Sequence, residues 1–240
     1  MADAAVPYIT KINNVKEVNL FGAADLSFWQ ARLKPRGLAP YDDKGQALLL
    51  LAAADLRWLG IRFQEFTVSV VVSRQEDGRG QDASYLVAAT NSSRPLAWAE
   101  RNFFDTPYDF GLVQLEPQPP ASLALGVGSS TLLRASMVGG RPVQRRGQEV
   151  WEGTIFLPQG ARQKNGANRR FYARLGGQTD IYPFLPAADT FAPAPSSDAY
   201  ALADRVQLPA AGMASPRRRR ARALADLHRV GLTRTRRNWR

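Results

Sequence analysis

The sequence predicts a mainly β protein (α+β), built as an antiparallel curved sheet or barrel with a few short helices. In QEFTVSVVVS, residues 64–73, the apolar Phe66, Val68 and Val70 recur at the two-residue period of a strand with one buried face. The polar stretch RQEDGRGQDA separates this strand from a second one, SYLVAATNS, which predicts a hairpin. Four later apolar stretches, SLALGV, STLLRASMV, EVWEGTIFLP and RRFYARLG, are separated by Gly and Pro turns, which is typical of a meander.

The elements around the hairpin include two predicted helices and one ambiguous segment. The segment ALLLLAAADLRW, residues 47–58, is compatible with a buried strand or with a helix, and its periodicity does not decide between them. AADLSFWQARLKPRG predicts a helix, with Asp25 or Ser27 as its N-cap and Gly37 after its last turn. PLAWAERNFF, residues 95–104, predicts the second helix.

Composition divides the chain into three parts. We expect one β domain over residues 1–186, a Pro- and Ala-rich linker over residues 187–215, and an arginine-rich tail over residues 216–240. The linker buries little apolar surface, and its prolines prevent a long helix. The tail holds ten arginines and one acidic residue, so it carries +9 of the net charge of +11 and the domain is nearly neutral.

Composition also excludes several kinds of site. The chain has no cysteine and a single histidine, His228, which excludes disulfides, thiolate metal sites, a cysteine nucleophile and a histidine-based triad in the domain. We expect no metal and no cofactor. The first residues lack the charged leader and apolar core of a signal peptide, and the longest apolar run, residues 47–54, is too short to span a bilayer. These features predict a cytoplasmic protein without a transmembrane segment.

A family resemblance rests on RFQEFTVSVVV, the hairpin, and YLVAATNSSRPLAWAERNFFDTPYDFG. In order and spacing these segments resemble acetoacetate decarboxylase and its superfamily, in which an aromatic-x-Glu strand, a hairpin and a short helix lead to an aromatic-Pro-Lys-Lys-x-Gly segment with a Schiff-base lysine. The matching residues are 63–65, 95–104 and 107–111, within a similar region of about residues 21–116. The resemblance implies an antiparallel β-barrel, a small-molecule ligand and, weakly, a homo-oligomer.

The chain departs from that family at the reactive position. Tyr108 and Asp109 stand where the family has two lysines, and a tyrosine cannot form an imine. The neighbouring cation that activates the reactive lysine is absent as well. None of the five lysines lies in the matching strands or loop, and ALLLLAAAD lacks the family's second glutamate, offering a carboxyl only at Asp55. We therefore do not expect a Schiff-base decarboxylase.

The remaining polar residues predict a different site. In a barrel of this kind Glu65, Tyr108 and Asp109 would face one cavity, and they suit proton transfer, hydration or dehydration of a small oxygenated or carboxylated ligand. Arg57 and Arg62 could bind a ligand carboxylate. This predicts a lyase-, hydratase- or isomerase-like enzyme or a binding protein. Two other interpretations stay open: Glu65 pairs with an arginine in its own sheet, and Tyr108 fills the space of the lost lysine while Asp109 caps a turn.

The tail predicts an alternative function of another class. Arg217, Arg218, Arg219 and Arg220 are adjacent, and such clusters bind nucleic acid or anionic membranes through counterion release. The barrel would then be the scaffold of a non-enzymatic interaction protein. The other interpretation of the tail is a solvated extension without a partner.

Overall fold

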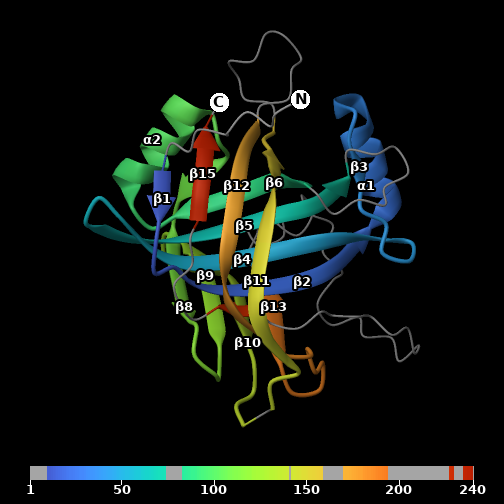
Figure 1. Ribbon diagram of the computed structural model, residues 1–240, viewed down its shortest axis with the longest axis vertical. Helices are drawn as coiled ribbons and strands as arrows, with labels where there is room; N and C mark the ends of the chain where they lie inside the picture. Colours follow the sequence, from blue (N-terminus) through green and yellow to red (C-terminus); the bar gives the residue numbers. More distant parts are fainter. Residues whose placement is uncertain are drawn as a thin grey trace.

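The computed structural model describes residues 10–73, 83–140, 142–158, 170–193, 227–229 and 235–239. These residues form a sheet of 11 strands, a second sheet of four strands and two α-helices (Figure 1). The large sheet contains β1 (Thr10–Ile12), β2 (Lys16–Asp25), β3 (Ala39–Pro40), β4 (Gln46–Trp58), β5 (Ile61–Ser73), β6 (Ala83–Asn91), β7 (Tyr108–Phe110), β11 (Arg145–Phe156), β12 (Arg170–Ile181), β14 (Leu227–Arg229) and β15 (Thr235–Trp239). The second sheet contains β8 (Leu112–Glu116), β9 (Ser122–Val127), β10 (Ser130–Ser136) and β13 (Thr190–Pro193).

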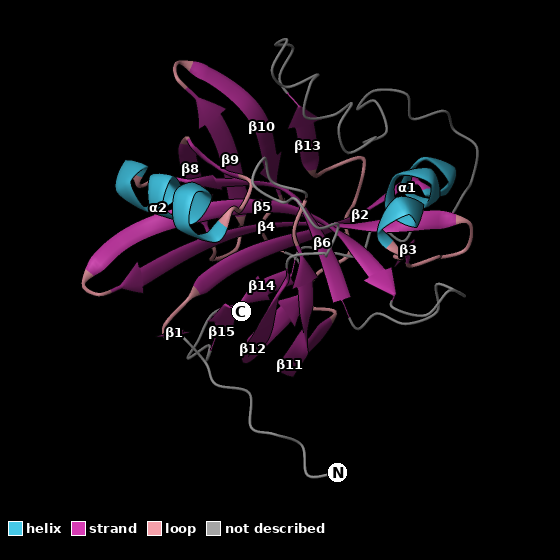
Figure 2. Ribbon diagram, turned by 90° about the horizontal axis from the view of Figure 1, so that it is seen from above, coloured by secondary structure: helices cyan, strands magenta, loops and turns pink. Residues whose placement is uncertain are grey.

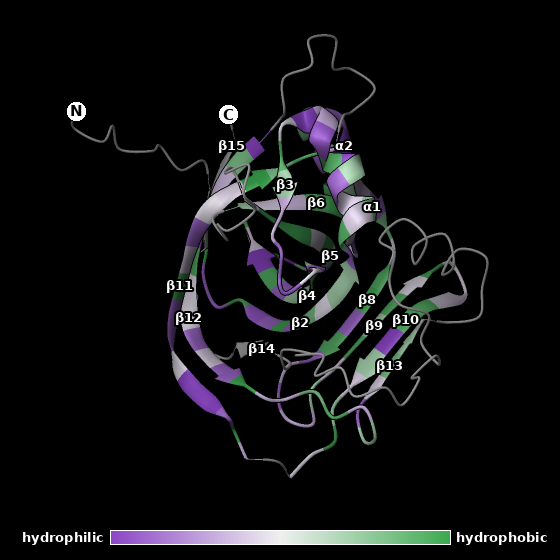
Figure 3. Cartoon of the chain, turned by 90° about the vertical axis from the view of Figure 1, so that its right-hand side faces the viewer, coloured by the Kyte–Doolittle hydropathy of each residue, from purple (hydrophilic) through white to green (hydrophobic). Residues whose placement is uncertain are grey.

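The large sheet curls until its two sides meet. Its strands follow the order β2, β4, β5, β6, β11 and β12, and β14 pairs with both β2 and β12, which closes a barrel. Figure 3 shows β11 and β12 across the interior from β2 and β4. The pairs of β6 with β11 and with β7 are parallel, and the other strand pairs are antiparallel. The predicted mainly β fold with a curved sheet is confirmed.

The ambiguous apolar segment forms β4, a strand of 13 residues. Leu49 and Leu51 face the core between the two sheets, whereas Leu48 and Leu50 line the inside of the barrel. Because both faces of this strand meet protein walls, its sequence is a continuous apolar run rather than an alternating one. The predicted hairpin is also present, as the antiparallel pair of β5 and β6.

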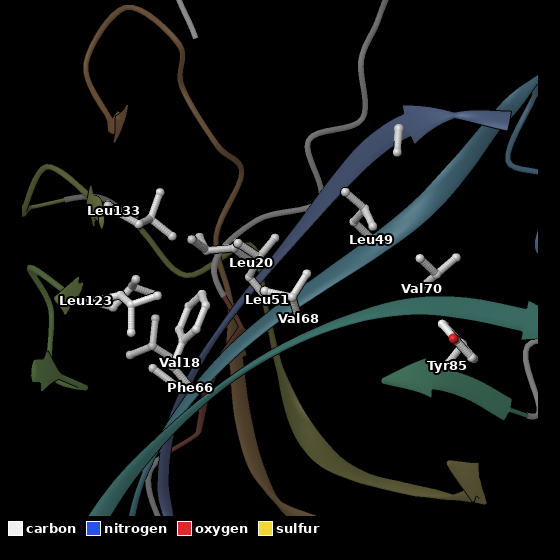
Figure 4. Close-up of a cluster of buried hydrophobic side chains, with 14 of the residues drawn as sticks. Val18, Leu20, Leu49, Leu51, Phe66, Val68, Val70, Tyr85, Leu123 and Leu133 are labelled. Carbon is white, nitrogen blue, oxygen red and sulfur yellow. The ribbon is translucent and has the colours of Figure 1, made fainter. Parts of the chain in front are cut away.

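The main hydrophobic core lies between the barrel and the second sheet. Outward-facing residues of β2, β4 and β5 meet residues of β9 and β10 there, and Figure 2 shows the second sheet on one side of β4 and β5, with β11 and β12 on the other. Figure 4 labels ten of the core residues: Val18, Leu20, Leu49, Leu51, Phe66, Val68, Val70, Tyr85, Leu123 and Leu133. This core occupies one face of the central strands, so their other face is available to the barrel interior.

Both predicted helices are present. In α1 (Leu26–Leu33) the side chain of Asp25 accepts a hydrogen bond from the backbone N–H of Phe28 at 2.6 Å, so Asp25 is the N-cap. A 3-10 turn (Lys34–Arg36) follows and ends at Gly37 with φ of 63°. The second helix, α2 (Arg94–Phe104), lies between β6 and β7. No helix in the described part of the chain is long and apolar enough to cross a membrane.

Three short strands lie beyond the expected end of the domain. β13 falls within the expected linker and pairs with β10, while β14 and β15 fall within the expected tail and pair with strands of the large sheet. Residues 194–226 lie outside the described part of the chain, and they include Arg217, Arg218, Arg219 and Arg220. The division into domain, linker and tail therefore stays a prediction.

Candidate functional site

A cavity of about 270 Å³ lies inside the barrel, with walls from β2, β4, β5, β6, β7, β11 and β12. Side chains alternate across a strand, so every second residue faces this cavity within residues 48–56 of β4 and 65–71 of β5. Much of the wall is apolar, from Leu50 and Leu56 of β4 to Trp151 of β11 and Phe171 and Leu175 of β12. A mostly apolar cavity with a few polar groups is the usual form of a small-molecule site.

Two buried glutamates lie in one transverse row across the barrel wall. The strand register pairs Glu17 of β2 with Ala54 of β4, Ala54 with Glu65 of β5, and Glu65 with Asn91 of β6. Neighbouring strands are about 4.8 Å apart, so the two glutamate Cα atoms are separated by roughly 10 Å. Glu17 and Glu65 are 9% and 3% exposed. The small side chain of Ala54 lies between them, and a ligand over Ala54 can reach both carboxyl groups.

Asn91 is the neighbour of Glu65 on the side opposite Ala54, and it forms a hydrogen bond with the Glu65 carboxyl group. Its Nδ2 donates to Oε1 of Glu65 at 3.4 Å, and its Oδ1 accepts from the backbone N–H of Ser93 at 2.8 Å. The Ser93 contact orients the amide so that its NH₂ group faces the glutamate. Asn91 is itself buried. It therefore positions the Glu65 carboxyl rather than forming part of the cavity wall.

Tyr108 brings a phenol to the same cavity. It is the first residue of β7, where it pairs with Ala89 of β6, and the carbonyl of Pro107 accepts from the N–H of Ala89 at 3.3 Å. The tyrosine is buried in a small cluster with Leu86 and Phe171, which also line the cavity. Glu65 and Tyr108 thus both line this cavity.

Asn19 adds a buried polar atom that lacks a partner. It lies two residues after Glu17 on β2, so both side chains point to the same face of the strand and both line the cavity. Asn19 is 3% exposed, and its Oδ1 has no hydrogen-bond partner among the described residues. Buried acceptors are nearly always satisfied, so this oxygen marks a place for a donor from a ligand or a water molecule.

Asp109, Arg57 and Arg62 do not face the cavity, which corrects the expectation for these three residues. Asp109 follows Tyr108 in a strand, so its side chain points the opposite way. It is exposed and forms an ion pair with Arg101 of α2 at 3.0 Å. In β4 the even-numbered residues line the cavity and in β5 the odd-numbered ones do, which leaves both Arg57 and Arg62 on the outside.

Arg62 instead pairs with a neighbour on the outer surface. Its Nε donates to Oδ1 of Asp55 at 3.0 Å. This hydrogen bond and the negative charge of Asp55 raise the pKa of Arg62 above its usual value. A carboxylate ligand inside the barrel is therefore out of reach of this arginine.

The described cavity wall contains acidic residues and no basic one. Besides Glu17 and Glu65, it includes Glu149 of β11, which forms an ion pair with the exposed Arg145. Lys16, Lys34 and Lys44 are exposed and outside the wall, and the side chains of Lys11 and Lys164 are outside the described part. No group of three metal-binding side chains occurs among the described residues. The described wall thus offers carboxyl groups and a phenol but no imine-forming lysine.

Gly111, which follows Tyr108 and Asp109 by two to three residues, is fixed by close packing. A Cβ atom at this position would lie 2.7 Å from the carbonyl oxygen of Gly126 and 2.7 Å from Cγ2 of Thr90. The N–H of Gly111 donates to the carbonyl of Asn91 at 3.2 Å. The glycine is therefore needed where the chain passes from β7 of the large sheet to β8 of the second sheet, whatever residues precede it.

Solved structures share this fold. Acetoacetate decarboxylase from Legionella pneumophila superposes with a TM-score of 0.62 at 12% identity, over 97% of this chain and 86% of that chain. An acetoacetate decarboxylase-like enzyme from Sphingomonas wittichii RW1 gives a TM-score of 0.54 at 12% identity, over 95% and 89%. The enduracididine biosynthesis enzyme MppR in complex with pyruvate gives 0.52 at 14% identity, over 98% and 89%.

Comparison of the sequence itself with protein-family models and with curated proteins finds no match. The likeness is therefore one of architecture, and it extends over nearly the whole chain at 12% identity with the Legionella enzyme. The chain has the fold of acetoacetate decarboxylase and of acetoacetate decarboxylase-like enzymes.

Proposed function

We propose that the protein binds a small organic molecule inside the barrel and acts on it by acid–base chemistry, without forming an imine. The observation that carries this proposal is the convergence of Glu65, Glu17 and Tyr108 on one mostly apolar cavity. Solved proteins of the same fold are named as enzymes, and one of them holds pyruvate. These names support the general kind of function.

The roles follow from chemistry and placement. A carboxyl group and a phenol on one cavity can act as base and acid on the same ligand, and proton transfer by a positioned side chain contributes about 10²–10⁴-fold to a rate. We assign the base to Glu65, because Asn91 holds its carboxyl in place, and the acid to Tyr108. Glu17 lies across Ala54 from Glu65 and provides a second carboxyl to bind or orient the ligand.

Deuterium exchange tests this proposal. The full chain would be incubated in D₂O with a panel of small oxo, hydroxy and amino compounds, and ¹H NMR would follow the loss of carbon-bound protons. Glu65→Gln and Tyr108→Phe should each slow exchange by about 100-fold or more, because each removes one proton-transfer group. Glu116→Gln on β8 and Tyr41→Phe are the matched controls, since both residues lie outside the cavity.

The outcomes separate the parts of the proposal. Equal exchange rates in Glu65→Gln, Tyr108→Phe and the controls would refute the assigned roles. Borohydride treatment with a 3-oxo acid should leave no covalent adduct, and a trapped adduct would show that imine chemistry persists. The predicted polyanion binding by Arg217–Arg220 remains an alternative that concerns residues outside the described part of the chain.

A further inference from the structure

We propose that the C-terminal strands β14 and β15 bring two arginines, Arg229 and Arg237, to the inner face of the barrel, and that Arg229 is the charge partner of Glu17. This inference rests on the proposed function, because it adds a positioning residue to the same site. It also assigns part of the expected basic tail to the barrel wall. Three observations support it: strand register, the burial of Glu17, and the distribution of charge around the cavity.

The first observation is the register of β14. This strand lies between β2 and β12, where Arg229 pairs with Glu17 on one side and with Thr179 on the other. Residues that pair across neighbouring strands lie on the same face of a sheet. Glu17 lines the cavity, and Thr179 lies four residues after the cavity-lining Leu175 on β12, an even spacing that keeps it on the same face. Position 229 therefore lies on the inner face of the barrel.

The register of β15 places Arg237 in the same way. Arg237 pairs with Ala173 of β12, which lines the cavity. The preceding residue, Arg236, pairs with Arg174, whose side chain is 48% exposed on the outer face of β12. Arg236 and Arg237 therefore occupy opposite faces of one strand, and they form a matched pair for experiments.

The second observation is the burial of Glu17. Glu17 is 9% exposed and Thr179 is 1% exposed, so position 229 lies between two buried neighbours. Glutamates are almost never this buried unless they are paired. Directly opposite residues of an antiparallel pair have Cα atoms about 4.5–5.5 Å apart, a span that an arginine and a glutamate on one face can bridge. Arg229 is thus placed to balance the charge of Glu17 and to fix the direction of its carboxyl group.

The third observation is the distribution of charge. Among the side chains that the structure describes, the cavity wall contains Glu17, Glu65 and Glu149 and no basic residue. The sequences of β14 and β15, LHR and TRRNW, contain three arginines and no acidic residue. Carboxylates that share a low-dielectric space repel one another more strongly than in water. Arginines on the inner face of these two strands would offset that repulsion.

The pairing gives each glutamate of the transverse row its own neighbour. In this row Glu17 lies next to Ala54 on one side and Arg229 on the other, while Glu65 lies between Ala54 and Asn91. Asn91 forms a hydrogen bond with Glu65. Arg229 would fix Glu17 from the opposite end, so the space over Ala54 lies between two positioned carboxyl groups. Arg229 acts through Glu17 and is a positioning residue.

Chemical labelling tests the placement without any ligand. Phenylglyoxal modifies accessible arginine side chains, and tandem mass spectrometry of the labelled full chain gives the rate at each arginine. Arg229 and Arg237 should react at least about tenfold more slowly than Arg236, because a side chain inside the barrel is reached only when the sheet opens locally. Equal rates at Arg236 and Arg237 would overturn the placement.

A double-mutant cycle tests the pair, again without ligand. Glu17→Gln and Arg229→Gln should each lower the melting temperature by about 6–20 °C, because each leaves a buried charge uncompensated. The double variant should be more stable than either single variant. Arg236→Gln is the matched control and should lower the melting temperature by no more than about 4 °C. Losses that simply add in the double variant would overturn the pairing.

Deuterium exchange then connects the pair with the site. Because Glu17 orients the ligand, Arg229→Gln should raise the compound concentration at half-maximal exchange about tenfold and change the maximal rate less than about threefold. If both quantities stay as in the wild type, Arg229 is not a positioning residue. If no compound exchanges with the wild type, the proposed function fails. Slow labelling and a coupled cycle would in that case still establish the cation inside the barrel.

Discussion

The substitution Asn19→Leu is expected to make the protein more stable while it impairs ligand binding. Oδ1 of Asn19 is buried without a partner, and an unsatisfied buried acceptor costs about 1–3 kcal/mol. Leucine has the same branching at Cγ and needs no hydrogen bond. The free energy of unfolding should therefore rise by about 1–3 kcal/mol, or about 2–4 °C of melting temperature per kcal/mol for a chain of this size.

The matched control is the same substitution at Asn91, which is buried and hydrogen-bonded through both its Nδ2 and its Oδ1. Asn91→Leu removes the contacts with Glu65 and with the N–H of Ser93, so it should lower the free energy of unfolding by about 1–3 kcal/mol. Urea unfolding without ligand, followed by tryptophan fluorescence, measures both variants. If Asn19→Leu destabilises the protein as much as Asn91→Leu does, then Oδ1 of Asn19 has a donor in the ligand-free protein and our reasoning about the cavity is wrong.

Three further predictions concern other parts of the molecule. Asp109→Ala should change the free energy of unfolding by less than about 1 kcal/mol in urea titrations, because Asp109 forms an exposed pair with Arg101 outside the cavity. For the same reason it should leave the rate of deuterium exchange unchanged. A large loss of exchange would show that Asp109 takes part in the site. Gly111→Ala should cost about 1–3 kcal/mol in the same titrations, since the new Cβ meets the Gly126 carbonyl at 2.7 Å, and an unchanged midpoint would contradict the close packing seen there. Burial raises the pKa of Tyr85 above 10.0, so its contribution to stability is present below pH 10 and is lost as the pH rises through the folded-state pKa. Between pH 8 and 11 the melting temperature of Tyr85→Phe should therefore fall less steeply with pH than that of the wild type. Identical slopes of melting temperature against pH would refute this.

Much of the fold could be predicted because its signals are local. The alternation of β5, the polar turn after it and the return strand β6 lie within one stretch of chain, and the structure pairs them as a hairpin. The N-cap at Asp25 and the left-handed Gly37 mark the start of α1 and the end of the turn that follows it. The type of β4 could not be predicted, because a strand buried on both faces has no alternation to distinguish it from a buried helix.

The candidate site was predictable in part for a related reason. The resemblance predicted that Glu65 and Tyr108 would face one cavity, and both line the cavity inside the barrel. Once the segment is known to be a strand, alternation shows that the side chains of Tyr108 and Asp109 lie on opposite faces of the sheet. By the same argument, the side chains of Arg62 and Glu65 lie on opposite faces of β5. A short strand such as β7, with three residues, carries no periodic signal of its own.

By itself the sequence determined the class of fold, its two helices and the absence of a lysine at positions 108 and 109. Only the tertiary structure decided that Glu17 and Asn19 belong to the site. In KEVNLF these residues alternate with Val18 and Leu20, a pattern that ordinarily indicates one buried and one solvated face. The closing of the sheet brings β11 and β12 over that polar face. Such long-range pairing cannot be predicted from the pattern of residues within one segment. The polar face of β2 therefore became the inside of a cavity.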